Sequence, residues 1–142
     1  MEEPMFTDTD RALLDRPLHG LLTIPPGPQR LPAPRPVWFE RTADDEIQLF
    51  SMADALKVRR LEAEPLASFV VITPGGEPEG WVSIEADVTL PEDGATDLAL
   101  RLAERYWEDL TPERRDRIED YSVEENLRRI VLHPRRVTRG PA

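Results

Sequence analysis

Short runs of apolar and β-branched residues, each followed by turn-forming residues, occupy the first part of the chain. Three such runs lie at 21–24, 37–39 and 47–50, separated by the proline-rich PPGPQRLPAP (25–34) and the polar RTADDE (41–46). Residues of this kind favour strands, and proline is excluded from helix interiors. We therefore predict three strands that are joined as an antiparallel meander.

Further strands follow from the alternation of apolar and polar residues. One is predicted at 69–73 and a closing one at 127–132, whereas the tail RRVTRGPA (135–142) is expected to fray. The segment WVSIEADVTL (81–90) predicts a long strand between them. Its side chains alternate between two faces, with Trp81, Ser83 and Glu85 on one and Val82, Ile84 and Ala86 on the other.

Apolar residues three and four positions apart predict helices at about 8–14, 54–64 and 95–110, and a fourth from residue 112. Thr7 or Asp8 caps the first, and Thr111 precedes a proline at the first position of the last. Six short strands with these helices indicate a mainly β protein. We expect a small antiparallel barrel with helices packed outside, in a single domain over residues 1–142.

Composition narrows the function classes. The chain has 142 residues, no cysteine and a net charge of -10, so disulfides and thiolate catalysis are excluded. The acidic balance argues against a nucleic-acid or anionic-membrane surface. No apolar run approaches the roughly 20 residues that cross a bilayer, and no secretion signal is evident. We therefore expect a cytoplasmic protein without a membrane partner.

Most residues that carry chemistry stand alone. His19 and His133 lack both a serine motif and a close-spaced metal-ligand pair, so structural roles are favoured for them. The acidic clusters at 44–46 and 62–64 are typical of solvated surfaces, and the glycines form no nucleotide-binding fingerprint. If the chain performs chemistry, a cofactor supplies the reactive group.

Lys57 is the most informative basic residue. It is the only lysine among the 18 Lys and Arg residues of the chain. It lies on the first turns of the predicted helix after strand 47–50. Free N–H groups and the helix dipole favour an anion at such a place. Ser51 offers a hydroxyl there, and Arg35 can bind an anion as a fork. These residues indicate a phosphate site.

A plainer interpretation remains open at this point. Lys57, Arg59 and Arg60 also lie within reach of carboxylates in sequence, so they can pair with them on the surface at little energetic gain. The acidic candidates are Asp54, Glu62, Glu64 and Glu46.

The segments RPVWF and EIQLFSMADALKVRRLEAEP, within 35–65, resemble the cofactor-binding core of the pyridoxamine 5'-phosphate oxidase-like split-barrel family. That family includes flavin and deazaflavin oxidoreductases. Its pattern is an Arg-x-Val strand, a strand ending in Phe/Tyr-Ser/Thr, a loop, a lysine, and a helix that closes in an acidic-x-x-Pro turn. Arg35 and Val37, Phe50 and Ser51, Lys57, and residues 62–65 hold these places. The resemblance implies a six-stranded antiparallel split β-barrel with external helices.

The resemblance also implies a homodimer with cofactors in grooves between the subunits. Arg35, Ser51 and Lys57 would then hold the phosphate of FMN. Val37 and Trp38 would face the ring, and Phe50 and Met52 would line its edge. Trp81 would contribute from the partner subunit or belong to the dimer core. Arg60 stands where many relatives have asparagine, which leaves a longer anionic cofactor, the deazaflavin coenzyme, as the alternative to FMN.

Two departures limit the function that the resemblance implies. Glu40 stands where true pyridoxamine phosphate oxidases have a lysine for the substrate phosphate, and the chain lacks their basic, histidine-containing end. We therefore expect a flavin- or deazaflavin-dependent oxidoreductase that transfers hydride to or from another small molecule. The alternative is a non-catalytic flavin- or ligand-binding split barrel.

Overall fold

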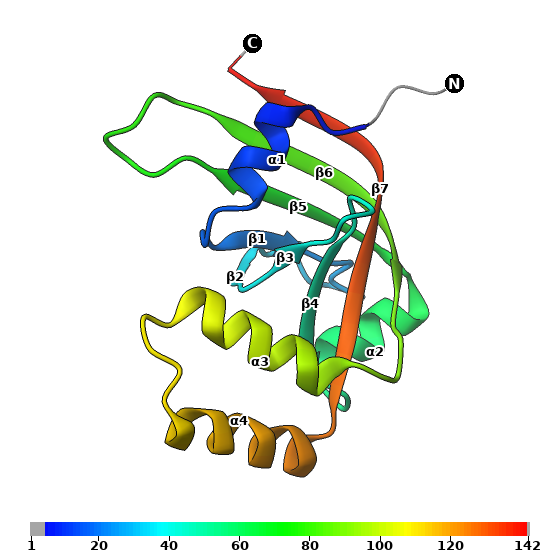
Figure 1. The fold of residues 1–142 in the computed structure, drawn as a ribbon. Helices are drawn as coiled ribbons and strands as arrows, with labels where there is room; N and C mark the ends of the chain where they lie inside the picture. The colour runs from blue at the N-terminus through cyan, green and yellow to red at the C-terminus, as the bar shows by residue number, and fades with distance from the viewer. Residues whose placement is uncertain (1–4, 142) are drawn as a thin grey trace.

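The computed structural model describes residues 5–141, apart from the side chains of residues 124 and 125. A curled antiparallel sheet of seven strands, in the order β2-β1-β5-β6-β7-β4-β3, forms its centre (Figure 1). The strands are β1 (Gly20–Thr23), β2 (Arg35–Val37), β3 (Glu40–Arg41), β4 (Ile47–Met52), β5 (Leu66–Ile72), β6 (Trp81–Thr89) and β7 (Leu127–Gly140). The mainly β class is confirmed. The seventh strand arises because the predicted strand 37–39 is replaced by two shorter ones.

Helices flank this sheet at the predicted places. In the described chain, α1 (Asp8–Leu14) lies against β6, and α2 (Leu56–Ala63) follows β4 (Figure 1). The helix α3 (Ala95–Tyr106) lies beside β4 and β7, and α4 (Pro112–Glu125) packs on α3. The Thr111 hydroxyl caps α4 by accepting the N–H of Arg114 at 3.2 Å. No helix within residues 5–141 is long and apolar enough to span a bilayer.

The predicted meander is wrong. β1 pairs with β2, but β3 and β4 lie at the other edge of the sheet. The segment between β2 and β3 therefore passes from one edge to the other. Phe39 fixes this passage, because its fully buried ring packs edge-to-face on Phe69 with centroids 4.9 Å apart. The Tyr106 hydroxyl, which donates to the Leu18 carbonyl at 2.7 Å, accepts the Phe39 N–H at 3.2 Å.

The tail that we expected to fray belongs to β7. The first half of this strand pairs with β4, and the second half, up to Gly140, pairs with β6. Pro134 has no N–H to donate, yet the ladder continues past it because a β-bulge opposite Glu85 and Ala86 interrupts the register there. The bulge therefore allows β7 to continue as one strand into the tail that was expected to fray.

The core lies on one face of the sheet. Val82, Ile84, Ala86 and Val88 of β6 are buried, whereas the residues between them are more exposed, so the predicted alternation is confirmed. They join a large apolar cluster with Leu22, Phe39, Ile47, Leu49, Phe69 and Ile130. Loss of water contact by such side chains is the main favourable term in folding.

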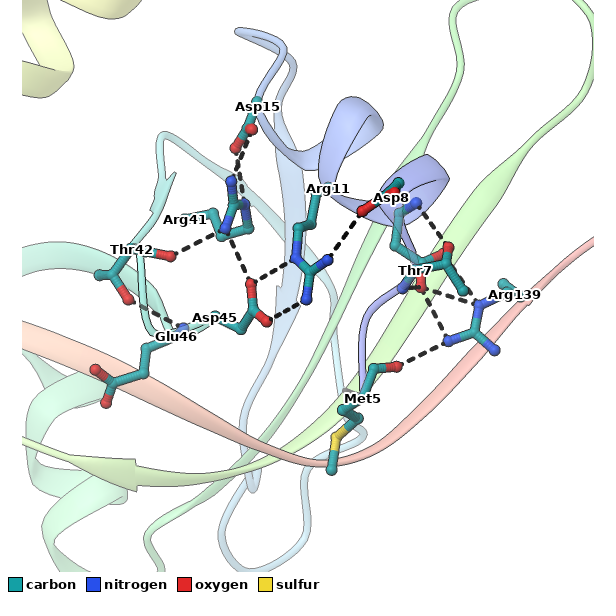
Figure 2. Close-up of polar contacts among 11 residues, drawn as sticks. Met5, Thr7, Asp8, Arg11, Asp15, Arg41, Thr42, Asp45, Glu46 and Arg139 are labelled. Atoms are coloured by element: carbon teal, nitrogen blue, oxygen red, sulfur yellow. Dashed lines mark hydrogen bonds and ion pairs between the residues drawn. The ribbon is translucent and has the colours of Figure 1, made fainter. Parts of the chain in front are cut away.

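A polar network fixes α1 to two parts of the sheet, the end of β7 and the turn between β3 and β4 (Figure 2). Asp10 is 2% exposed and accepts the Thr7 N–H at 2.8 Å, which completes a capping box at the start of α1. Arg139, near the end of β7, binds the same carboxylate at 2.9 Å. On the other side, Arg11 contacts Asp45 in the β3–β4 turn at 2.8 Å. The helix is thus held by charge-assisted hydrogen bonds at two places.

Asp10 should make stability depend on pH. Burial alone would raise its pKa, but hydrogen bonds from Arg139 and the Thr7 N–H outweigh burial and lower the pKa below its ordinary value of 3.8. The stabilisation is therefore present above 3.8 and is lost as the pH falls through the lower pKa of the folded state. We predict that Asp10→Asn lowers the free energy of unfolding by roughly 1–2 kcal/mol at neutral pH, since Arg139 is partly solvated.

Thermal unfolding of both proteins as a function of pH checks this prediction. The difference between wild type and Asp10→Asn should shrink in acid. Asp8→Asn is the control, because the Asp8 side chain is fully exposed. Equal midpoints for wild type and Asp10→Asn at neutral pH would contradict the role given to this carboxylate.

Candidate functional site

Four basic side chains line one cavity beside the start of α2. They are Arg30, Arg35, Lys57 and Arg60, and the cavity has a volume of about 190 Å³. We call it the basic pocket. Apolar residues complete its wall: Ile24, Pro25, Pro26, Leu31, Ala33 and Leu56. Three predicted site residues, Arg35, Lys57 and Arg60, are thus brought together.

Local structure explains how these cations meet. Arg35 opens β2, opposite Leu22 of β1, whereas Lys57 lies in the first turn of α2, which follows β4. Ala55 at the N-cap provides no side-chain hydrogen bond, so donors of the first turn remain available to a ligand. Gly27 has φ 73, and a Cβ there would collide with the guanidinium of Arg60. The glycine therefore leaves room for this cation.

No carboxylate neutralises the basic pocket among the described residues. Within residues 5–141, apart from the side chains of 124 and 125, the four cations make no ion pair and no side-chain hydrogen bond. The ion pairs there involve other residues: Glu46 contacts His133, and many arginines elsewhere bind Asp or Glu. Arg59 donates to the backbone carbonyl of Asp54. The surface pairing of Lys57 and Arg60 with nearby carboxylates is therefore wrong for the described part of the chain.

Burial, and the nearby charge of Arg35, lower the pKa of Lys57. Both effects disfavour the ammonium form in the ligand-free protein. A bound phosphate would counter the effect of Arg35, because an opposite charge within a few ångströms favours the charged amine, whereas the effect of burial would remain. The donors in the pocket, three guanidiniums and one amine, are those that proteins use for phosphate.

Trp38 and Phe50 line a second cavity, of about 240 Å³, between the sheet and the helices α3 and α4. We call it the aromatic cavity. The Trp38 ring stacks on Tyr106 with centroids 5.2 Å apart and meets Trp107 edge-on at 5.5 Å. Phe50 also packs against the small apolar cluster that includes Ala99. The two predicted ring contacts thus share one apolar site, separate from the basic pocket.

The other predicted site residues are not gathered in either cavity. Val37 packs against the core, Ser51 lies half-buried on β4, and Met52 is 36% exposed at the end of that strand. Trp81 lines a different cavity near α1, where its indole lies across Gly140. Within one chain, Trp81 is thus apart from Lys57, and its role as a partner-subunit contact stays a prediction.

Sequence reasoning missed two contributors to the basic pocket. Arg30 and Gly27 both come from the proline-rich segment 25–34, which predicts only a turn. The one available signal was a basic residue inside an otherwise uncharged loop. Its distance from Lys57 along the chain gives no hint that the loop folds over α2.

Glu40 has a different setting from the one we expected. Its carboxylate accepts hydrogen bonds from Arg101 at 2.8 Å and from the Gln48 amide at 2.6 Å. Because Arg101 compensates the charge, Glu40 is not a free repulsive group. Position 40 still offers no lysine to a substrate phosphate.

Comparison of the chain with protein-family profiles gives no match, and comparison with curated protein sequences gives none either. Solved structures do match. A conserved hypothetical protein from Mycobacterium tuberculosis has a TM-score of 0.75 at 20% identity, covering 94% of this chain and 84% of that one. An F420 reductase has a TM-score of 0.69 at 21% identity, with 90% and 94% covered. A putative pyridoxamine 5'-phosphate oxidase from Listeria innocua has a TM-score of 0.63 at 15% identity, with 92% and 94% covered.

This chain has the split-barrel fold. The resemblance carried by residues 35–65 is thereby confirmed at the level of the fold. Because a fold hosts many functions, the split barrel does not by itself identify the ligand or the reaction. The side chains of the basic pocket and the aromatic cavity must supply that argument.

The basic pocket should reduce the stability of the ligand-free split barrel. The pKa of Lys57 is lower than its ordinary value of 10.5, so the unfolded chain binds more protons between the two values, and stability rises with pH in that window. We predict that Lys57→Met raises the thermal midpoint in buffer without phosphate and removes this rise. The replacement keeps a similar shape but removes a half-buried charge.

Thermal unfolding of the two proteins at several pH values checks this prediction. Arg59→Met is the matched control, because Arg59 is exposed and lies outside the pocket. A midpoint that falls with Lys57→Met would show that the amine has a stabilising partner.

Proposed function

We propose that this split barrel binds FMN or a deazaflavin coenzyme, holds the phosphate in the basic pocket, and acts as an oxidoreductase on a small molecule. The observation that carries the proposal is the group of four cations around one cavity without a described carboxylate partner. Each charge-assisted hydrogen bond contributes roughly 1.5–3 kcal/mol. Three such bonds near the top of that range reach the roughly 8 kcal/mol of micromolar binding, and contacts to the ring would add to them.

The size of the basic pocket fits a phosphate group rather than a whole cofactor. Its volume of about 190 Å³ lies below the roughly 300–1,000 Å³ of pockets that enclose most of a drug-sized ligand. A phosphate with one or two adjoining carbons fills that space. The ring system of a flavin-type cofactor would therefore lie outside the pocket.

The bound cofactor would supply hydride transfer, and the chain would supply binding and orientation. Arg35 and Lys57 would hold the phosphate from opposite elements, the strand β2 and the helix α2. Arg60, which lies against Gly27, would connect the phosphate site to the proline-rich loop. The apolar wall formed by Ile24 and Leu56 would limit water near these charges, which strengthens their attraction for an anion.

The number of cations bears on which cofactor binds. One phosphate monoester is satisfied by two or three donors, whereas four cations can bind more than one anionic group. The deazaflavin coenzyme has a phosphodiester and a glutamate tail, and the exposed Arg30 lies at the pocket's edge where a longer ligand would continue. The similarity in fold to an F420 reductase supports this alternative to FMN.

A second candidate function is a non-catalytic ligand carrier. The residues that line the basic pocket include no aspartate, glutamate, histidine or tyrosine, so Lys57 is the only lining side chain suited to proton transfer, and a bound phosphate would occupy it. A carrier would bind the cofactor tightly without turnover. Reduction of the bound cofactor by NAD(P)H, or oxidation of a reduced deazaflavin, would distinguish the enzyme from the carrier.

Two copies of the chain would complete the groove in this proposal. The pocket is too small for a whole cofactor, and two of its wall residues are exposed leucines, Leu31 at 87% and Leu56 at 53%. Exposed apolar groups around a site favour a partner surface. Trp38 is not such an exposed group, because it packs within its own chain on Tyr106 and Trp107.

Light scattering checks the homodimer. We predict a dimer at micromolar concentration and dissociation in Leu56→Glu, because a charge on the covered face must be desolvated. Val123→Glu is the control, since Val123 is 82% exposed on α4 and lies outside the basic pocket. A monomeric wild type would refute the shared groove.

Titration of ligand-free protein with FMN and with riboflavin tests the phosphate site. We predict that Lys57→Ala and Arg35→Ala each weaken FMN binding by about tenfold or more, because each removes one charge-assisted contact. Riboflavin has the same ring without a phosphate, so its affinity should change little in either variant. The same titration with the deazaflavin coenzyme compares the two cofactors.

Arg59→Ala serves as the charge control, because Arg59 adjoins Lys57 and Arg60 in sequence but does not line the pocket. Equal FMN affinities for wild type, Lys57→Ala and Arg35→Ala would show that the phosphate binds elsewhere. Equal losses for FMN and riboflavin would indicate a damaged fold rather than a lost phosphate contact.

A further inference from the structure

Lys57 combines three properties that together exceed the needs of a phosphate ligand. It is the only lysine of the chain, it is half-buried in the wall of the basic pocket, and it makes no ion pair with a described residue. A surface lysine is usually solvated and fully protonated. Lys57 instead lines a small cavity together with three arginines.

This environment favours the neutral amine. Burial lowers the pKa of Lys57, and the adjacent Arg35 lowers it further. Near neutral pH a larger share of Lys57 is therefore unprotonated than of an exposed lysine. Neutral amines are nucleophiles toward carbonyl carbon, and a neighbouring cation is one of the established means of activating a lysine.

The arginines would position an anionic reactant beside this amine. Arg35 and Arg60 can bind a phosphate as forks, and Arg30 stands at the edge of the same cavity. A carbonyl group one or two carbons from the phosphate would then lie within the same space as Lys57. Holding the two reacting groups together in this way raises their effective concentration.

We propose that the basic pocket captures small phosphorylated aldehydes as reversible imines on Lys57. The nitrogen lone pair attacks the carbonyl carbon, a C–N bond forms, and the carbonyl oxygen leaves as one molecule of water. No oxidant or reductant is consumed. The cavity volume of about 190 Å³ favours a small ligand, such as a phosphate carried on two carbons.

This inference does not require the flavin-type cofactor, because the pocket and the amine alone carry it. Both ligands place a phosphate among the same cations, so they should compete. Cofactor binding would shield Lys57, and the aldehyde would react with the cofactor-free protein.

Reductive trapping tests the inference. Wild-type protein is incubated with glycolaldehyde phosphate or with uncharged glycolaldehyde, in the presence of sodium cyanoborohydride, and the labelled peptides are quantified by mass spectrometry. Lys57 is the only lysine of the sequence, so the α-amine at the N-terminus of the protein used serves as an internal reference. The measured quantity is the labelling rate of Lys57 divided by that of the N-terminal amine. We expect this ratio to be about ten times higher with glycolaldehyde phosphate than with glycolaldehyde, as one charge-assisted contact would produce.

Three controls identify the cause of any preference. The replacements Arg35→Gln and Arg60→Gln should reduce it, whereas Arg59→Gln, outside the pocket, should leave it unchanged. Inorganic phosphate should slow the labelling of Lys57 in wild type but not that of the N-terminal amine. Protein unfolded in urea should label both amines without preference for the phosphorylated aldehyde.

Equal relative rates for the two aldehydes at Lys57 would overturn the inference, and so would a preference that Arg35→Gln and Arg60→Gln leave intact. The two proposals can fail separately. If FMN affinity does not depend on Lys57 but trapping is selective, only the cofactor proposal is refuted. If FMN binds as predicted and trapping is unselective, only the imine is refuted.

Discussion

The pairing of β7 with two strands at once is the constraint on which the rest of the fold depends. Its first half forms a ladder with β4 and its second half with β6, so one strand joins the two parts of the sheet. β4 leads into α2, which carries Lys57. β6 is connected through β5 and β1 to β2, which carries Arg35. Because the sheet curls, these residues from its opposite parts line one cavity.

The charge distribution separates an acidic body, in which most arginines are paired with carboxylates, from a basic pocket whose cations are not paired within the described part of the chain. The chain has a net charge of -10, and most arginines near α1, β3 and β7 bind carboxylates. The basic pocket differs because its cations have no such partner among the described residues. Like charges in a partly buried place reduce stability unless a ligand compensates them. Proteins retain such locally unfavourable arrangements chiefly at functional sites.

Sequence reasoning succeeded where one local rule decides the outcome. The alternation along β6 and the proline stop after α2 follow from strand and helix periodicity, and the structure confirms both. The grouping of Arg35 with Lys57 was predicted from the helix N-terminus and the family resemblance rather than from composition. Their meeting in one cavity agrees with that part of the prediction.

The failures arise where distant segments decide. The tail from residue 135 was expected to fray, but it pairs with β6 beyond a β-bulge, and a bulge depends on the partner strand. The run at 37–39 has strand-forming residues, yet it does not form one strand. The Phe39 ring is buried in the core against Phe69, at the point where the chain passes from one sheet edge to the other. Arg30 and Gly27 reach the basic pocket only because the proline-rich loop folds over α2. None of these relations is present in local sequence.

The central claim is that the basic pocket holds the phosphate of a flavin-type cofactor. Phosphorus-31 NMR of FMN during titration with ligand-free protein tests it most directly, because the signal reports on the phosphate rather than on the ring. The account predicts a shifted phosphate resonance with wild type and a resonance close to that of free FMN with a variant in which Arg35 and Lys57 are both replaced by glutamine. Ring fluorescence quenched by wild-type protein without any shift of the phosphate resonance would contradict it.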